Sequence, residues 1–315
     1  ELVNAIRTKT VKELLKPAAY LVAALVLAVA VNAGMLWTTY EYGNESIRGK
    51  SNLSTNQLAP SNGLDKEYAY QWSQGVGENI TFLVPNFYGG ASNTPLPEDG
   101  AVVKSLTDKG VPEEQAVAFS KQLPSYWGEK PFTSGPIYFG AIVCFLFILG
   151  LVVVKGRTKW WIFTATLLSI FLAFGKNWSL VSDIFFQYFP LYNKFRAVSS
   201  IQVLLELLLP ILAIIGLQQF LFTSEGLEKK KKALMYATGI TTGITIIFIL
   251  FKSFLFDFTS PYDTYFMKDL GPRFVAAMEE DRMTLFTSDA LRSLIFVLLS
   301  AGILWFYFKS KLKGQ

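Results

Sequence analysis

The chain has 315 residues, of which 51% are hydrophobic and 17% are charged, and its formal net charge at pH 7 is +5. It contains no histidine and a single cysteine. These residues therefore exclude catalysis by histidine, Cys/His zinc sites and an internal disulfide, and no metal site is predicted. A P-loop and a dinucleotide fingerprint are also absent, so no cofactor is predicted.

Long apolar runs follow one another along the chain. A spanning helix needs about 20 mostly apolar residues, and a soluble core would not need so many runs of that length. The runs lie at residues 18–37, 136–154, 160–174, 200–222, 233–251 and 290–308, and the third is short for a full span. We therefore predict an all-α polytopic membrane protein with about six transmembrane helices and a large extracytoplasmic loop between the first two.

Lysine and arginine decide the predicted orientation, because basic residues next to spanning helices are retained in the cytoplasm. They are densest in short segments near both termini and at 155–159 and 229–232, which places both ends of this chain in the cytoplasm. The basic total is thus explained by topology and anionic lipid, and no nucleic-acid partner is predicted. The predicted order is a cytoplasmic helix (1–16), a transmembrane helix (17–37), the extracytoplasmic cap loop (38–135), transmembrane helices 2–4 (136–222) with an external interfacial segment (176–198), a basic cytoplasmic turn (223–232), transmembrane helices 5–6 (233–308) with an external segment (252–289), and a cytoplasmic tail (309–315).

The external segments contain helix signals of their own. In the cap loop, residues 64–74 and 111–122 are predicted helices, the second with Pro112 in its first turn. Aromatic residues dominate 176–198, which predicts an interfacial or re-entrant helix. Residues 273–285 are predicted to form a separate helix, and Asp289 is predicted to cap the last span.

A few ionisable residues are candidates for function. Glu206 is the one acidic residue inside the predicted spans, which makes it either a functional intramembrane group or a protonated or paired glutamate near the interface. Cations on the external rim could grip a lipid phosphate, or could anchor to headgroups and pair with nearby aspartates. The rim cations are Arg48, Lys50, Lys194, Arg196, Arg273, Arg282 and Arg292.

Several strings resemble the YfhO-type family of bacterial membrane proteins, in particular its Bacteroidetes-type members. The resemblance runs from the first apolar run to the last. Its strings are Glu45-Ser-Ile-Arg-Gly-Lys-Ser-Asn-Leu53, Gln71-Trp-Ser-Gln-Gly75, Phe82-Leu-Val-Pro-Asn-Phe-Tyr-Gly-Gly90, Tyr126-Trp-Gly-Glu-Lys-Pro-Phe-Thr-Ser-Gly-Pro136, Phe189-Pro-Leu-Tyr-Asn-Lys-Phe-Arg196 and Asp281-Arg-Met-Thr-Leu-Phe-Thr-Ser-Asp-Ala-Leu-Arg-Ser293.

The resemblance implies a C-type glycosyltransferase-like fold and a bacterial inner-membrane location. It implies action on a polyprenyl-phosphate-linked sugar at the extracytoplasmic face, in modification of a cell-envelope glycan or lipid. The catalytic carboxylate of such enzymes is expected upstream of Glu1, so the chain is expected to lack the N-terminal part of the family. Among the rim cations, the turn of Asn193, Lys194 and Arg196 is the first candidate for holding the lipid phosphate, and Arg48 is the second.

Two alternatives remain beside this interpretation. A non-catalytic component of an envelope assembly complex would have other envelope proteins as partners, and it needs no acid or base in these residues. A lipid-linked sugar transporter would show discontinuous helices and polar groups near the midplane, for which Glu206 is thin support. Membrane lipids are expected partners in every case.

Overall fold

The structure is a computed structural model that describes residues 10–49, 63–223 and 226–313. All regular elements in that part of the chain are helices, in agreement with the predicted fold class. The chain divides into two compact units. The first comprises Glu1–Tyr68 with Asn193–Phe195, and the second comprises Ala69–Tyr192 with Arg196–Gln315.

The first unit is mainly one long, exposed apolar segment. Its helices are α2 (Val11–Val31) and α3 (Ala33–Asn44), and neither contains a buried residue. They meet at Asn32, whose Nδ2 donates a hydrogen bond to the carbonyl oxygen of Ala28 at 2.9 Å. The predicted boundary between residues 16 and 17 falls inside α2, which continues through Pro17. The predicted helix at 1–16 otherwise lies largely outside the described residues.

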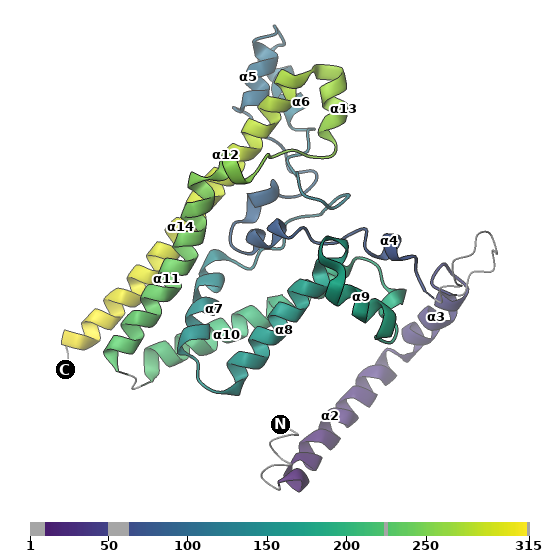
Figure 1. The fold of residues 1–315 in the computed structure, drawn as a ribbon, viewed down its shortest axis with the longest axis vertical. Coiled ribbons are helices and arrows are strands. Elements are labelled where there is room, and N and C mark those ends of the chain that lie inside the picture. The colour runs from purple at the N-terminus through teal and green to yellow at the C-terminus, as the bar shows by residue number, and fades with distance from the viewer. Residues whose placement is uncertain (1–9, 50–62, 224–225, 314–315) are drawn as a thin grey trace. The chain divides into compact units, whose positions relative to one another are not determined.

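Five long helices form the framework of the second unit (Figure 1). They are α7 (Ala141–Val153), α8 (Arg157–Ala173), α10 (Val203–Phe222), α11 (Leu227–Leu250) and α14 (Pro272–Lys313). Helices α7 and α10 approach closely, since a Cβ on Gly216 would lie 2.4 Å from the Cα of Gly150. Small residues permit this kind of contact between apolar helices. Helix α11 runs beside α14 (Figure 1).

The predicted apolar runs all form helices, but fewer than six of these helices have the length and composition of a complete membrane span. Four are long and apolar enough, or five if the bent pair of α8 and the following helices counts as one span. Helix α7 has 13 residues, which corresponds to about 20 Å and falls short of the ~30 Å hydrocarbon core. The four are Val11–Val31, Val198–Phe222, Glu228–Leu250 and Pro272–Lys309.

The predicted interfacial segment forms a short helix set at 113° to α8. Helix α9 (Ser179–Tyr188) follows the 3-10 turn η3 (Gly175–Trp178). Its inner face is fixed by Ser182, whose hydroxyl donates to the carbonyl oxygen of Leu172 at 3.1 Å. On its outer face Leu180, Ile184 and Tyr188 are exposed at four-residue spacing, an amphipathic pattern suited to a membrane interface.

The cap between the apolar helices consists of short helices joined by turns. They are α4 (Lys66–Ala69), η1 (Gly77–Phe82), η2 (Pro85–Tyr88), α5 (Ala101–Thr107) and α6 (Glu113–Ser120). The helix predicted at 111–122 is confirmed as α6, with Pro112 directly before it. The helix predicted at 64–74 is reduced to the four residues of α4.

The segment at 252–289, predicted to be external, differs most from its prediction. It holds α12 (Lys252–Leu255) and α13 (Asp263–Leu270), and the expected helix at 273–285 is the first part of the 42-residue α14. Asp289 therefore lies inside a helix and caps nothing; one carboxylate oxygen accepts the N–H of Asn86 at 3.1 Å. With α5 and α6, the start of α14 and α13 form a small apolar core around Val102 and Phe274.

Arg282 is buried inside this region, so its prediction as a rim cation is wrong. It is fully buried and makes a bidentate pair with Asp263, at 2.6 and 2.8 Å. Its remaining guanidinium contacts are the carbonyl oxygens of Phe258, at 2.9 Å, and Pro124, at 3.2 Å. One side chain thus joins α14, α13 and the end of the cap loop.

Loss of the Asp263 charge should destabilise the second unit strongly. In Asp263→Asn the buried Arg282 guanidinium would lose its counter-ion, a change that costs about 3–5 kcal/mol in other proteins. Asp269→Asn is the matched control, because Asp269 lies exposed on the same helix. Thermal unfolding in detergent should show a much lower midpoint for Asp263→Asn alone. Equal midpoints for the two variants would contradict a structural role for the pair.

Candidate functional site: a polar chamber and a basic groove

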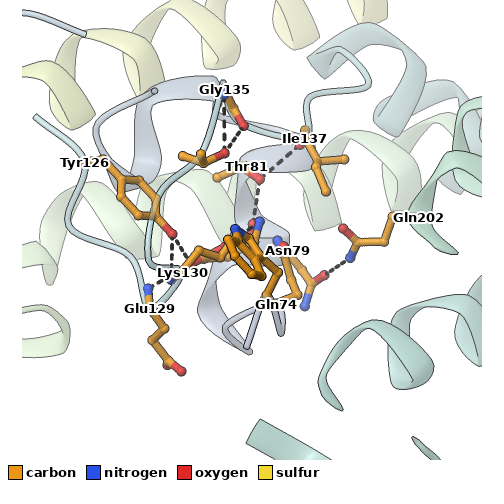
Figure 2. Close-up of polar contacts among 12 residues, drawn as sticks. Gln74, Asn79, Thr81, Tyr126, Glu129, Lys130, Gly135, Ile137 and Gln202 are labelled. Atoms are coloured by element: carbon orange, nitrogen blue, oxygen red, sulfur yellow. Dashed lines mark hydrogen bonds and ion pairs between the residues drawn. The ribbon is translucent and has the colours of Figure 1, made fainter. Parts of the chain in front are cut away.

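A buried carboxylate organises the polar part of the cap. Glu78, in η1, is 3% exposed, and its Oε2 lies 3.1 Å from the ammonium group of Lys130. Its Oε1 accepts hydrogen bonds from the Tyr126 hydroxyl, at 2.8 Å, and from the backbone N–H of Glu129, at 3.0 Å. Figure 2 shows Tyr126, Glu129 and Lys130 close together in the loop that follows α6, with the Glu129 side chain directed away from Tyr126. Three donors therefore hold the Glu78 carboxylate.

The environment of Glu78 fits a structural carboxylate better than a catalytic base. Both of its oxygens are already engaged by donors. Burial and the nearby Glu78 charge raise the pKa of Tyr126 far above its ordinary value, so the phenol keeps its proton and remains a donor. The same hydroxyl accepts the backbone N–H of Lys130 at 3.1 Å, which ties the loop back on itself.

A small, partly open cavity, the chamber, adjoins this cluster. Its volume is about 10 Å³. Gln74, 1% exposed, lines the chamber, and its Oε1 has no hydrogen-bond partner among the described residues. The other polar side chains of its wall are Glu78, Thr81, Tyr88, Tyr126, Lys130 and Thr133.

A larger, open hollow, the groove, lies next to the chamber and has a volume of about 270 Å³. Lys130, Thr133, Gly135 and Ile137 line both hollows. The remaining described residues along the groove are Trp72, Phe132, Ser134, Ala197, Ser199 and Ser200, and none of the groove residues is acidic.

Aromatic and basic groups meet at the edge of the groove. The guanidinium carbon of Arg196 lies 5.3 Å from the ring centroid of Trp72, a cation–π distance. Trp72 is itself fixed by Phe132: their rings make an edge contact at 5.1 Å, and the indole N–H donates to the Phe132 carbonyl oxygen at 3.3 Å. Arg196 is exposed and directly precedes Ala197, which lines the groove.

The groove also reaches the beginning of an apolar helical span. The 3-10 turn η5 (Val198–Gln202) leads directly into α10, and Ser199 and Ser200 of that turn line the groove. Ala197, just before the turn, has a left-handed backbone (φ 61°), and its N–H donates to the Ala69 carbonyl oxygen at 3.2 Å. Free N–H groups at a helix N-terminus favour anions, so this end of the groove adds to the attraction from Arg196.

The structure distributes the predicted phosphate-binding residues over both units. Arg48, Asn193 and Lys194 belong to the first unit, and Arg196 belongs to the second. Arg48 Nε donates to the Lys194 carbonyl oxygen at 2.9 Å, and Lys194 Nζ donates to the Arg48 carbonyl oxygen at 2.5 Å. The Asn193 carbonyl oxygen accepts the N–H of Leu64 at 2.9 Å. These contacts give the first three residues a local structural role, whereas Arg196 adjoins a groove.

Glu206 lies in the first turn of α10 and is exposed. No side-chain contact that would give Glu206 a function is seen in the described part of the chain, so its role stays a prediction. Sequence reasoning did not single out Gln74, Glu78 or Lys130. Each is a common polar residue in a turn-rich loop, and only the long-range approach of 74–81 to 126–137 makes them a site.

In the described residues no group of three or more cysteine or acidic side chains is placed to hold a metal ion. Comparison with known proteins found no matching family model, no matching curated protein and no matching solved structure.

The packing around Glu78 predicts a severe effect for the change Gly128→Ala. A Cβ at residue 128 would lie 2.3 Å from Glu78 Oε1 and 2.4 Å from the Tyr126 hydroxyl oxygen, and both atoms are buried and hydrogen-bonded. Overpacking of this kind costs about 1–3 kcal/mol. Gly135→Ala is the control, because a Cβ there meets nothing within 4 Å. Thermal unfolding should separate the two variants, and equal midpoints would show that the loop adapts freely.

Proposed function

We propose that this chain is a glycosyltransferase-like protein of the bacterial inner membrane that binds a polyprenyl-phosphate-linked sugar on the extracytoplasmic face. Its role would lie in modification of a cell-envelope glycan or lipid. The proposal includes the six-span arrangement, with short α7 as one span and both ends of this chain cytoplasmic. The observation that carries it is the stacking of Arg196 on Trp72 at the edge of the groove, beside the N-terminal end of an apolar span.

The chemistry of the groove suits a lipid phosphate. A guanidinium group forms bidentate, charge-assisted hydrogen bonds with phosphate, and its stacking on an indole limits the side-chain freedom that binding would otherwise remove. The hydroxyls of Ser199 and Ser200 and the helix N-terminus add neutral donors. The polyprenyl tail would follow the apolar surface of α10, on which Val203, Leu204 and Leu207 are exposed.

A non-catalytic role in an envelope assembly complex is the second candidate. One observation favours it: no described groove residue is acidic, and Glu78 has both carboxylate oxygens engaged. Sugar transfer needs a base to deprotonate the acceptor. The first proposal therefore assigns carrier binding to this chain and assigns the catalytic base to none of its described residues.

Binding of polyprenyl phosphate to the protein in lipid nanodiscs tests the proposed site. We expect Arg196→Met to weaken binding about 10-fold to 100-fold, because a hydrogen bond to a charged group contributes roughly 1.5–3 kcal/mol. The affinity of Arg196→Lys should lie between those of the wild type and Arg196→Met, since lysine keeps the charge and loses the bidentate geometry. Lys176→Met is the control: Lys176 is exposed on η3 and does not line the groove. Equal affinities for wild type and Arg196→Met would exclude the groove as the phosphate site.

The proposed orientation predicts which positions a membrane-impermeant maleimide can label. Cys144 is the single cysteine, so Cys144→Ala gives a background without thiols. Lys104 in α5 and Lys229 in the first turn of α11 are both exposed. Helix α5 and the beginning of α11 lie at opposite ends of the second unit (Figure 1). In intact cells Lys104→Cys should be labelled, and Lys229→Cys should be labelled only after permeabilisation. The reverse pattern would overturn the predicted orientation.

A further inference from the structure

Gln74 is a buried side chain of the second unit with an unpartnered polar atom in the wall of the chamber. Its backbone is fixed on both sides: its N–H donates to the Ala173 carbonyl oxygen at 2.8 Å, and its carbonyl oxygen accepts from Asn177 Nδ2 at 2.9 Å. The side chain is 1% exposed, and its Oε1 is unpartnered in the wall of the chamber. A buried acceptor without a donor costs about 1–3 kcal/mol. The chamber is therefore built around an acceptor that requires a donor.

The other walls of the chamber define which donor fits. The Glu78 and Lys130 charges lie 3.1 Å apart and offset each other, so the chamber favours a neutral group over a phosphate. Tyr88, also in the wall, has a pKa raised well above its ordinary value by burial and by Glu78, so it keeps its hydroxyl proton. A volume of about 10 Å³ admits one group of the size of a water molecule. A single hydroxyl group satisfies all three conditions.

The position of the chamber connects it to the groove. Lys130, Thr133, Gly135 and Ile137 are shared walls, so a molecule in the groove lies against the residues that close the chamber. Trp72 and Phe132 give the groove an aromatic surface, against which the apolar C–H face of a sugar ring can pack. A ring held there can direct a hydroxyl towards Gln74.

We propose that the chamber is a recognition subsite for one hydroxyl group of a groove-bound sugar, with Gln74 Oε1 as the hydrogen-bond acceptor. This inference rests on the proposed function, because it requires the sugar carrier to occupy the groove. Water fills the chamber when the groove is empty, and the sugar hydroxyl displaces it. Gln74 is thus a specificity residue for the sugar and contributes nothing to the binding of the phosphate.

Two ligands separate sugar recognition from phosphate binding. Affinities of the protein in nanodiscs would be measured for polyprenyl phosphate and for polyprenyl-phosphate hexose. We expect Gln74→Leu to weaken binding of the hexose carrier about fivefold to tenfold and to leave binding of the sugar-free carrier unchanged. Gln202→Leu is the matched control. Gln202 is equally buried and also has an unpartnered Oε1, but it lines neither hollow, and Figure 2 shows it beyond Asn79, on the side away from Tyr126.

A second measurement needs no variant and so does not depend on the folding of Gln74→Leu. Hexose carriers that each lack one hydroxyl would be bound to the wild-type protein, and removal of one particular hydroxyl should weaken binding fivefold to tenfold. If the wild type binds neither carrier, the proposed function fails. If it binds both, and neither Gln74→Leu nor any single hydroxyl changes the hexose affinity, the subsite is overturned and the chamber holds water only.

Discussion

The polar face of α14 is the constraint on which the second unit depends. The cap helices α4, η1, η2, α5 and α6 have eight residues at most, and helices of that length are not stable by themselves. Helix α14 instead provides four side chains that bond to the cap backbone. Asp281 accepts the N–H groups of Ala101 and Val102, Arg282 donates to Pro124, Asp289 accepts from Asn86, and the Ser293 hydroxyl donates to Leu83. A continuous helix therefore fixes the loop that carries the chamber.

Aromatic packing next to the chamber also holds the cap against α11 and α14. Phe87 is fully buried, and its ring contacts Phe248 of α11, Phe286 of α14 and Trp127 of the cap. Tyr88 follows it in the chain and stacks on Trp127 at 4.1 Å. The two walls of the chamber, η1–η2 and residues 126–137, are thus joined by an apolar cluster on one side and by Glu78 on the other. This rigidity keeps a cavity of one-water size open beside a polar cluster.

The sequence predicted what depends on composition and short-range pattern, and missed what depends on distant contacts. Apolar length identified every long helix, and Pro112 correctly marked the start of α6. Helix α7 is shorter than the predicted span, because turn residues on both sides leave only 13 helical positions in an apolar run of 19 residues. The role of Arg282 was wrong because its partner Asp263 lies on another helix, and a charge pattern cannot distinguish a buried pair from a rim cation.

In the candidate site, too, residues in a short-range pattern could be predicted and residues defined by distant contacts could not. Arg196 could be predicted because it stands in a short basic and aromatic turn, whereas Gln74 could not, since its significance lies in the partner it lacks. Natural sequences satisfy buried polar groups almost everywhere, so an exception in the wall of a cavity is more informative than a satisfied residue. Ala197, with its left-handed backbone, is a second local exception, and it lines the adjoining groove. The coincidence of both exceptions in neighbouring hollows is the strongest physical reason to look for a ligand there and not along the apolar helices.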